Sequence, residues 1–172
     1  MTLTRVKVTK STFYVLMCET APGNKARSEV NASSGPTDSV PPRILMAEDN
    51  VINQRVGKLI LQRAGYTIDL AADGVETLEA HKKQPYDLIL MDCQMPIMDG
   101  FEASREIRRL ALPQPAIVAV TANALVGERE RCLNAGMDDY LSKPFQAEQL
   151  VAVVVKWVNI RQNTKSKEAS TA

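Results

Sequence analysis

The segment Asp87-Leu88-Ile89-Leu90-Met91-Asp92 contains four consecutive apolar residues that end at an aspartate. An unbroken run of Leu, Ile and Met is typical of a strand that is buried on both faces of a parallel sheet. In open α/β sheets, ligands bind outside the carboxyl ends of such strands. Asp92 is therefore a candidate functional residue.

Three other apolar runs end in polar or charged side chains in the same way. They are Ile44-Leu45-Met46-Ala47 before Glu48-Asp49, Ala116-Ile117-Val118-Ala119-Val120 before Thr121, and Tyr140-Leu141-Ser142 before Lys143. The carboxyl ends of parallel strands lie along one edge of their sheet, so these side chains and Asp92 are expected to form one site.

The segments between these runs have helical spacing and helix signals. Asn50 is expected to cap a helix, and Gly65 to end it. The expected strands are 43–47, 66–71, 87–92, 116–121 and 139–142, and the expected helices are 50–64, 74–83, 100–110, 126–134 and 146–159. Such alternation predicts an α/β fold with a five-stranded parallel sheet and helices on both faces.

Helical periodicity also assigns an inward face to three of these helices. The expected inward residues are Ile52, Val56, Leu59 and Ile60 in the first helix, Phe101, Ile107 and Leu110 in the third, and Leu150, Val154, Trp157 and Val158 in the last.

Composition narrows the class of protein. The chain has 172 residues, a net charge of +1 and 45% hydrophobic residues, which is enough for one domain with a core. Near-neutral charge disfavours a nucleic-acid binder that relies on phosphate contacts.

We expect no membrane contact, because the longest apolar runs are far shorter than the roughly 18 residues of a membrane span. Three cysteines without metal or disulfide spacing, and no secretory signal, favour a reducing, cytoplasmic location.

The predicted domain organisation has four parts. Residues 43–160 form the regular α/β domain. Residues 19–42, rich in Ser, Thr, Asn, Gly and Pro, are expected to be a linker. Residues 1–18 contain one strand-like run at 11–16 and are either a remnant of an upstream domain or disordered. The polar residues 161–172 are expected to be a disordered tail.

The candidate site has the parts needed for phosphoryl transfer to a carboxylate. Glu48, Asp49 and Asp92 would crowd negative charge, which a hard cation such as Mg²⁺ would neutralise. Lys143 offers a compact positive charge for a phosphate, and Thr121 offers a hydroxyl donor. A nucleophile, a metal, a cation and a hydroxyl donor together favour an aspartyl-phosphate chemistry.

The stretch from Arg43 to about Asn159 resembles the receiver domain of two-component response regulators. The motifs that carry the resemblance are Ile44-Leu45-Met46-Ala47-Glu48-Asp49-Asn50, Leu90-Met91-Asp92-Cys93-Gln94-Met95-Pro96-Ile97-Met98-Asp99-Gly100, Val120-Thr121-Ala122-Asn123 and Asp138-Asp139-Tyr140-Leu141-Ser142-Lys143-Pro144-Phe145. The resemblance implies a flavodoxin-like, doubly wound (βα)5 fold.

The resemblance also implies a metal centre around a phosphoacceptor. Asp92 is implied to accept the phosphoryl group. Asp49 and Asp92 are implied to bind Mg²⁺ directly, together with the backbone carbonyl of Gln94. Glu48 is implied to act through a metal-bound water.

Three further positions acquire implied roles. Thr121 and Lys143 are implied to hold the phosphoryl group, and the Lys143-Pro144 bond is implied to be cis. Tyr140 is either a half-buried sheet aromatic or, by resemblance, a switch residue whose rotamer follows Thr121.

A narrower resemblance is to receivers fused to hybrid sensor histidine kinases. It rests on Glu48-Asp49-Asn50-Val51-Ile52-Asn53-Gln54, Met91-Asp92-Cys93-Gln94-Met95-Pro96 and Thr121-Ala122-Asn123-Ala124-Leu125, and residues 11–16 are similar to the last strand of a kinase ATP-binding domain. The implied partners are a sensor histidine kinase, which supplies a phosphohistidine, and a histidine phosphotransfer protein, which takes the phosphoryl group onward. A weak homodimer is also compatible with the resemblance.

Two other functions stay open. A haloacid-dehalogenase-like phosphatase also forms an aspartyl phosphate with Mg²⁺, but it needs an aspartate where this chain has Gln94. The second is a receiver-fold binding module that is never phosphorylated. Elsewhere, His81 is expected to be a solvated side chain at a helix end, and Cys93 an inert thiol without a base partner.

Overall fold

Strands and helices alternate along the chain, as predicted. The computed structural model describes residues 41–122 and 127–169, so the strand predicted at 11–16 and most of the predicted linker lie outside the described residues. The strands are β1 (Ile44–Ala47), β2 (Ile68–Ala71), β3 (Leu88–Asp92), β4 (Ala116–Thr121) and β5 (Asp139–Ser142), and the helices are α1 (Val51–Arg63), α2 (Gly74–Lys83), α3 (Gly100–Arg109), α4 (Glu128–Asn134) and α5 (Ala147–Ala169).

Within the described residues, the five strands form one parallel sheet in the order β2-β1-β3-β4-β5. The strand order reverses between β1 and β3. In a doubly wound sheet, a ligand site is expected where the order reverses. The predicted flavodoxin-like (βα)5 architecture is therefore confirmed, and its switch point lies between the strands that precede Asp49 and Asp92.

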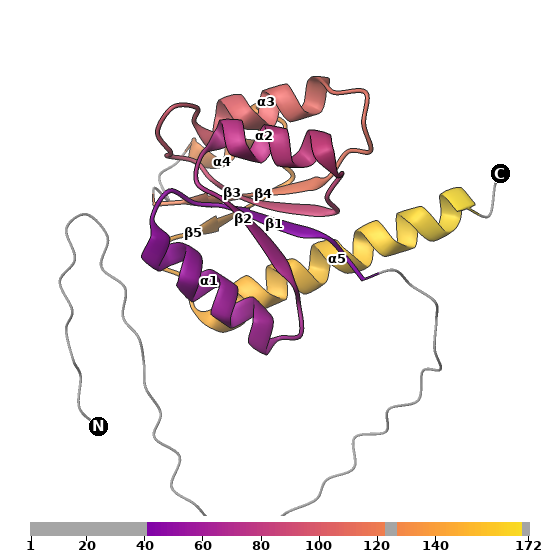
Figure 1. Ribbon diagram of the computed structural model, residues 1–172, viewed down its shortest axis with the longest axis horizontal. Coiled ribbons are helices and arrows are strands. Elements are labelled where there is room, and N and C mark those ends of the chain that lie inside the picture. Colours follow the sequence, from indigo (N-terminus) through magenta and orange to yellow (C-terminus); the bar gives the residue numbers. More distant parts are fainter. Residues whose placement is uncertain (1–40, 123–126, 170–172) are drawn as a thin grey trace, which may run out of the picture. The chain divides into compact units, whose positions relative to one another are not determined.

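Helices cover both faces of the sheet. Figure 1 shows α2, α3 and α4 on one face, and α1 and α5 on the other. Successive residues of β1 and β3 enter two separate cores, because side chains alternate across a strand. Leu45 and Ile89 pack with the α2–α4 layer, whereas Met46 and Leu90 pack with the α1 and α5 layer. No helix in the described ranges is long and apolar enough to cross a membrane.

The helices that follow the first three strands begin at side-chain caps. Asn50 Oδ1 accepts from the backbone N–H of Ile52 at 2.9 Å, which confirms the predicted cap of α1. Asp73 and Asp99 cap α2 and α3 in the same way. Capping satisfies backbone donors that would otherwise lack partners. The cap of α1 follows β1 closely, so the loop that carries Asp49 is short.

The predicted inward face of α1 is only partly right, because Val56 and Ile60 are half-buried and Ile60 packs against the core, whereas Ile52 and Leu59 point outward. The buried stripe is Asn53, Gly57 and Leu61, whereas Ile52 is 55% exposed and Leu59 is 50% exposed. A Cβ at Gly57 would lie 2.6 Å from the end of the Met46 side chain, so α1 packs closely against β1 at this glycine. Apolar spacing did not reveal this, because the stripe contains one polar residue and one residue without a side chain.

His81 is not the solvated side chain that was predicted, because it is completely buried. Its Nδ1 accepts from the backbone N–H of Tyr86 at 3.2 Å, and the two rings stack with centroids 6.4 Å apart. Burial, aided by the positive charge of Arg108, lowers the pKa of His81. The turn before β3 brings Tyr86 back over the end of α2 and covers the imidazole.

The last helix is longer than predicted. It was expected to end at Asn159, but α5 continues to Ala169, so the expectation of a disordered tail is wrong for residues 161–169. No glycine or proline occurs between Ile160 and Ala169 to stop the helix. The other predicted inward faces hold for Phe101, Ile107, Leu150, Val154 and Val158, which are all buried.

Candidate functional site

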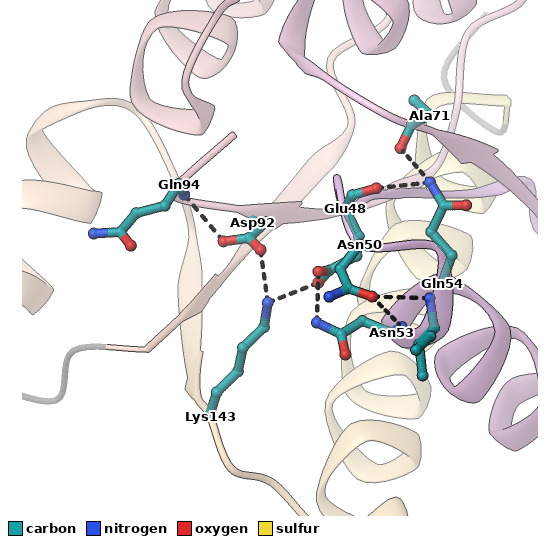
Figure 2. Close-up of polar contacts among 9 residues, drawn as sticks. Glu48, Asn50, Asn53, Gln54, Ala71, Asp92, Gln94 and Lys143 are labelled. Carbon is teal, nitrogen blue, oxygen red and sulfur yellow. Dashed lines mark hydrogen bonds and ion pairs between the residues drawn. The ribbon is translucent and has the colours of Figure 1, made fainter. Parts of the chain in front are cut away.

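Four strand ends meet at one edge of the sheet, and their polar side chains converge there. Lys143 reaches from the end of β5 across to the other strands (Figure 2). Its Nζ lies 2.6 Å from Glu48 Oε2 and 2.6 Å from Asp92 Oδ2, and its backbone N–H donates to the carbonyl of Thr121 at 2.7 Å. The structure thus brings Glu48, Asp92, Thr121 and Lys143 together, as expected from their positions after successive strands.

The Lys143 ammonium bridges two buried carboxylates. Glu48 is 1% exposed and Asp92 is 6% exposed. Burial raises the pKa of Glu48, and the negative charge of Asp92 adds to this, while Lys143 opposes it. Burial alone would lower the pKa of Lys143, but the charges and hydrogen bonds of Asp92 and Glu48 outweigh it and raise that pKa. Lys143 is therefore held as a cation between the two acids.

One lysine does not balance the acidic groups of the site. Carboxylate oxygens of Glu48, Asp49 and Asp92 all lie within 4.8 Å of one another. Three carboxylates and one ammonium leave an excess of negative charge when all of them are ionised. Mg²⁺ prefers a few carboxylate oxygens together with water, and the exposed Asp49 leaves one side of the cluster open to solvent. The donor set therefore fits Mg²⁺.

The loop after β3 fixes the orientation of Asp92. The backbone N–H of Gln94 donates to Asp92 Oδ1 at 3.0 Å, so each carboxylate oxygen of Asp92 has one partner (Figure 2). A Cβ at Gly100 would collide with the backbone carbonyl of Asp92, so α3 can begin at this point only with glycine. The side chain of Gln94 is exposed.

Thr121 and Tyr140, to which the sequence assigned roles in binding and switching, differ in burial. Thr121 is buried at the end of β4, and Tyr140 is 41% exposed on β5. The peptide bond between Lys143 and Pro144 is cis, as predicted. Cys93 is buried, and burial, reinforced by the neighbouring thiol of Cys132, raises its pKa well above the usual range, as an inert thiol requires.

Two amide side chains of α1 also belong to the site, and sequence reasoning did not assign them a role. Asn53 Nδ2 donates to Glu48 Oε1 at 2.7 Å, and Gln54 Nε2 donates to the backbone carbonyl of Glu48 at 2.7 Å. Apolar spacing gave no signal for Asn53, because it lies four and eight residues before Gly57 and Leu61 on a buried stripe that only the structure reveals.

Comparison with known proteins agrees with this geometry. Residues 44–155 match the family model of the response regulator receiver domain. The chain belongs to this family. The receiver is 42% identical over 126 residues to hybrid signal transduction histidine kinase B of Dictyostelium discoideum, a match that covers 66% of this chain and 6% of that protein. It is 36% identical to the sensor histidine kinase GacS of Pseudomonas protegens, over 86% of this chain and 16% of GacS.

Solved structures resemble the receiver as well. The receiver domain of sensor histidine kinase PA1611 from Pseudomonas aeruginosa, which has a magnesium ion coordinated in its active-site cleft, is 45% identical, with a TM-score of 0.63, over 70% of this chain and 99% of that one. The receiver domain of Ssk1 from Saccharomyces cerevisiae, crystallised with the histidine phosphotransfer protein Ypd1, provides a second match. It is 32% identical, with a TM-score of 0.63, over 69% of this chain and 91% of that chain.

Proposed function

We propose that this receiver accepts a phosphoryl group from a partner phosphohistidine on Asp92 and then passes it to a histidine phosphotransfer protein. The observation that carries the proposal is the setting of Asp92. It is a buried carboxylate with one oxygen on Lys143 and the other on the N–H of Gln94, beside two further acids. A carboxylate held in this way is oriented for attack without a large rearrangement.

The transfer is a displacement at phosphorus. A carboxylate oxygen of Asp92 forms the new P–O bond while the P–N bond of the donor breaks and its electron pair stays on the imidazole nitrogen. When held by Asp49, Asp92 and the backbone carbonyl of Gln94, with Glu48 acting through water, Mg²⁺ would neutralise charge on the phosphoryl oxygens. The hydroxyl of Thr121 would donate to one of these oxygens.

Lys143 has to exchange a partner during this transfer. Its Nζ is divided between Glu48 and Asp92, each at 2.6 Å, so it contacts both acids of the buried pair. A phosphoryl group on Asp92 adds negative charge on the side of Lys143. The ammonium would leave Glu48 and follow this charge, because an ion pair strengthens as the opposing charge grows. Lys143 thus stabilises the product as well as the resting site.

The exposed apolar residues near Asp92 are suited to a protein partner. Val51 is 57% exposed and Ile52 is 55% exposed in the first turn of α1, and Ile97 is 83% exposed in the loop after β3. Ile97 also has a φ of 68°, which is unfavourable for a β-branched residue. Apolar exposure and strain are more common at binding surfaces than elsewhere. We assign this surface to the phosphohistidine partner; the similar Ssk1 receiver was crystallised with a histidine phosphotransfer protein, so a partner of this class is the occupant that we propose.

The parent protein would be a hybrid histidine kinase, either cytoplasmic or anchored in a membrane with this receiver on its cytoplasmic side. This part of the proposal rests on the hybrid kinases among the relatives, although the chain matches only a small part of their length. The two cysteines among residues 41–122 and 127–169, Cys93 and Cys132, are free and buried, which fits a reducing compartment. The phosphatase alternative has no supporting feature, since Gln94 presents an exposed amide rather than an acid that could protonate a leaving group.

Acetyl phosphate tests the phosphoacceptor proposal. We expect incubation with Mg²⁺ to add the mass of one phosphoryl group to the intact protein, and we expect no addition when Mg²⁺ is chelated or in Asp92→Asn. An equal adduct in Asp92→Asn would rule out Asp92 as the acceptor. Failure of the folded wild type to gain any phosphoryl group would favour the binding module, and catalytic release of phosphate from a simple monoester would favour the phosphatase.

A further inference from the structure

The stretch Asn50-Val51-Ile52-Asn53-Gln54 contains three amide side chains that the phosphoryl-transfer roles leave unused. All three make hydrogen bonds around the acidic end of β1 (Figure 2). Asn50 caps α1 through Ile52, Gln54 donates to the Glu48 carbonyl at 2.7 Å, and Asn53 donates to the Glu48 side chain at 2.7 Å. The amides of Asn53 and Gln54 thus hold Glu48 by its side chain and by its backbone.

The contact between Asn53 and Glu48 is buried and specific. Asn53 is 7% exposed and lies on the stripe of α1 that faces the sheet. Because an ionised carboxylate can only accept hydrogen bonds, the NH₂ group of Asn53 has to face Glu48. Glu48 Oε1 is therefore held by a neutral donor, whereas Glu48 Oε2 is held by the ammonium of Lys143.

A bound metal ion would disturb the contact of Glu48 Oε2 but not that of Glu48 Oε1. A cation near Oε2 competes with Lys143, so that ion pair is exchangeable. The amide of Asn53 carries no charge, so a cation does not repel it and its hydrogen bond to Glu48 Oε1 stays in place. Groups that hydrogen-bond a metal-site carboxylate fix its direction and are typically worth about 10- to 100-fold in metal affinity.

We propose that Asn53 is a positioning residue for the metal centre: it holds Glu48 Oε1 so that Oε2 remains directed at the Mg²⁺ site when Lys143 withdraws. The inference rests on the proposed function for the identity of the cation. Asn53 would not touch the metal or the phosphoryl group, and it acts only through Glu48. Without the Asn53 amide, the Glu48 carboxylate is free to rotate, and fixing its direction when Mg²⁺ binds lowers the affinity for Mg²⁺.

Mg²⁺ titration of the purified chain by calorimetry, without any phosphodonor, tests this proposal. Asn53→Leu keeps the approximate shape and removes the donor, and we expect it to raise the Kd for Mg²⁺ by about tenfold or more. The matched control is Thr77→Val, which removes another fully buried donor, from Oγ1 to the Asp73 carbonyl at 2.7 Å in α2. This control is expected to lower stability and leave the Kd unchanged.

A double-mutant cycle separates positioning from packing. In a Glu48→Gln background, Asn53→Leu is expected to change the Kd for Mg²⁺ by less than about twofold, because residues that act through one contact are not additive. A Kd for Asn53→Leu equal to that of the wild type overturns the proposal, as does an undiminished effect in the Glu48→Gln background. If Asn53→Leu does not fold, Asn53→Ser is measured instead.

The result is independent of the phosphoacceptor proposal. Mg²⁺ affinity is measured without transfer, so a protein that binds Mg²⁺ but never gains a phosphoryl group would refute the proposed function and leave the role of Asn53 intact. If the protein is phosphorylated on Asp92 but its Mg²⁺ affinity does not depend on Asn53, the role of Asn53 is refuted and the proposed function stands.

Discussion

At the scale of single residues, Lys143 is the side chain on which the resting site depends most. Lys143→Met keeps most of the packing but leaves Glu48 and Asp92 buried without their shared cation. Removing one partner of a buried ion pair costs about 3–5 kcal/mol. We expect a loss of roughly this size in the free energy of unfolding, measured with denaturant in chelator, and a partial recovery when Mg²⁺ is added.

A surface lysine provides the control for this change. Lys82 pairs with Glu79 at 3.0 Å, but both side chains are largely solvated. Exposed pairs of this kind contribute about 0–1 kcal/mol, so Lys82→Met should be nearly neutral. Equal costs for the two substitutions, or no recovery of Lys143→Met in Mg²⁺, would contradict the view that Lys143 neutralises the site.

His81 makes stability depend on pH. Its pKa in the folded chain is lowered from the ordinary 6.5, so the unfolded chain binds a proton first as the pH falls. Stability is therefore complete above pH 6.5 and is lost progressively below it. The raised pKa of Glu48 changes stability with pH in the opposite direction. The contribution of His81 is therefore measured as the difference in the free energy of unfolding between the wild type and His81→Gln. We expect denaturant unfolding to show that this difference shrinks from pH 7.5 to about pH 5, and a constant difference would be contrary to a buried, neutral imidazole.

At the scale of elements, the junction between β3 and α3 connects the fold to the site. A Cβ at Gly100 would collide with the carbonyl of Asp92, which is backbone and cannot rotate away. We expect Gly100→Ala to lower the free energy of unfolding by about 1–3 kcal/mol and to reduce phosphoryl incorporation from acetyl phosphate. The exposed Arg105 of the same helix is the control, and Arg105→Ala should change neither quantity. If Gly100→Ala matched the wild type in stability and in phosphoryl incorporation, the close approach of Gly100 to the Asp92 carbonyl would not be needed for either.

The exposed face of α1 is predicted to be a docking surface rather than part of the core. Ile52→Glu places a charge on a residue that is 55% exposed, so folding should change by less than about 0.5 kcal/mol. Transfer from a phosphorylated histidine phosphotransfer protein should slow by tenfold or more, while labelling by acetyl phosphate stays at the wild-type level. Equal slowing with both donors would place the defect in the site instead of the surface.

At the scale of the whole molecule, the sheet and its active edge could be predicted because each strand carries its own signals. A short apolar run that ends in Glu48, Asp92, Thr121 or Lys143 shows both the strand and the side chain at its end. The burial of Asn53 could not be predicted this way, because it depends on Glu48 and on the close approach of Gly57 to Met46. His81 was misjudged for the same reason: its cover, Tyr86, belongs to the next loop.

Transfer of a phosphoryl group from a phosphohistidine to Asp92 can be measured with purified proteins. A histidine phosphotransfer protein, phosphorylated beforehand, is mixed with this receiver and Mg²⁺, and the intact masses of both proteins are followed over time. We predict that the donor loses one phosphoryl group while the receiver gains one, and that Asp92→Asn gains none. The claim would be contradicted if Asp92→Asn gained a phosphoryl group as fast as the wild type. It would also be contradicted if the folded wild type took none from a donor that phosphorylates another receiver.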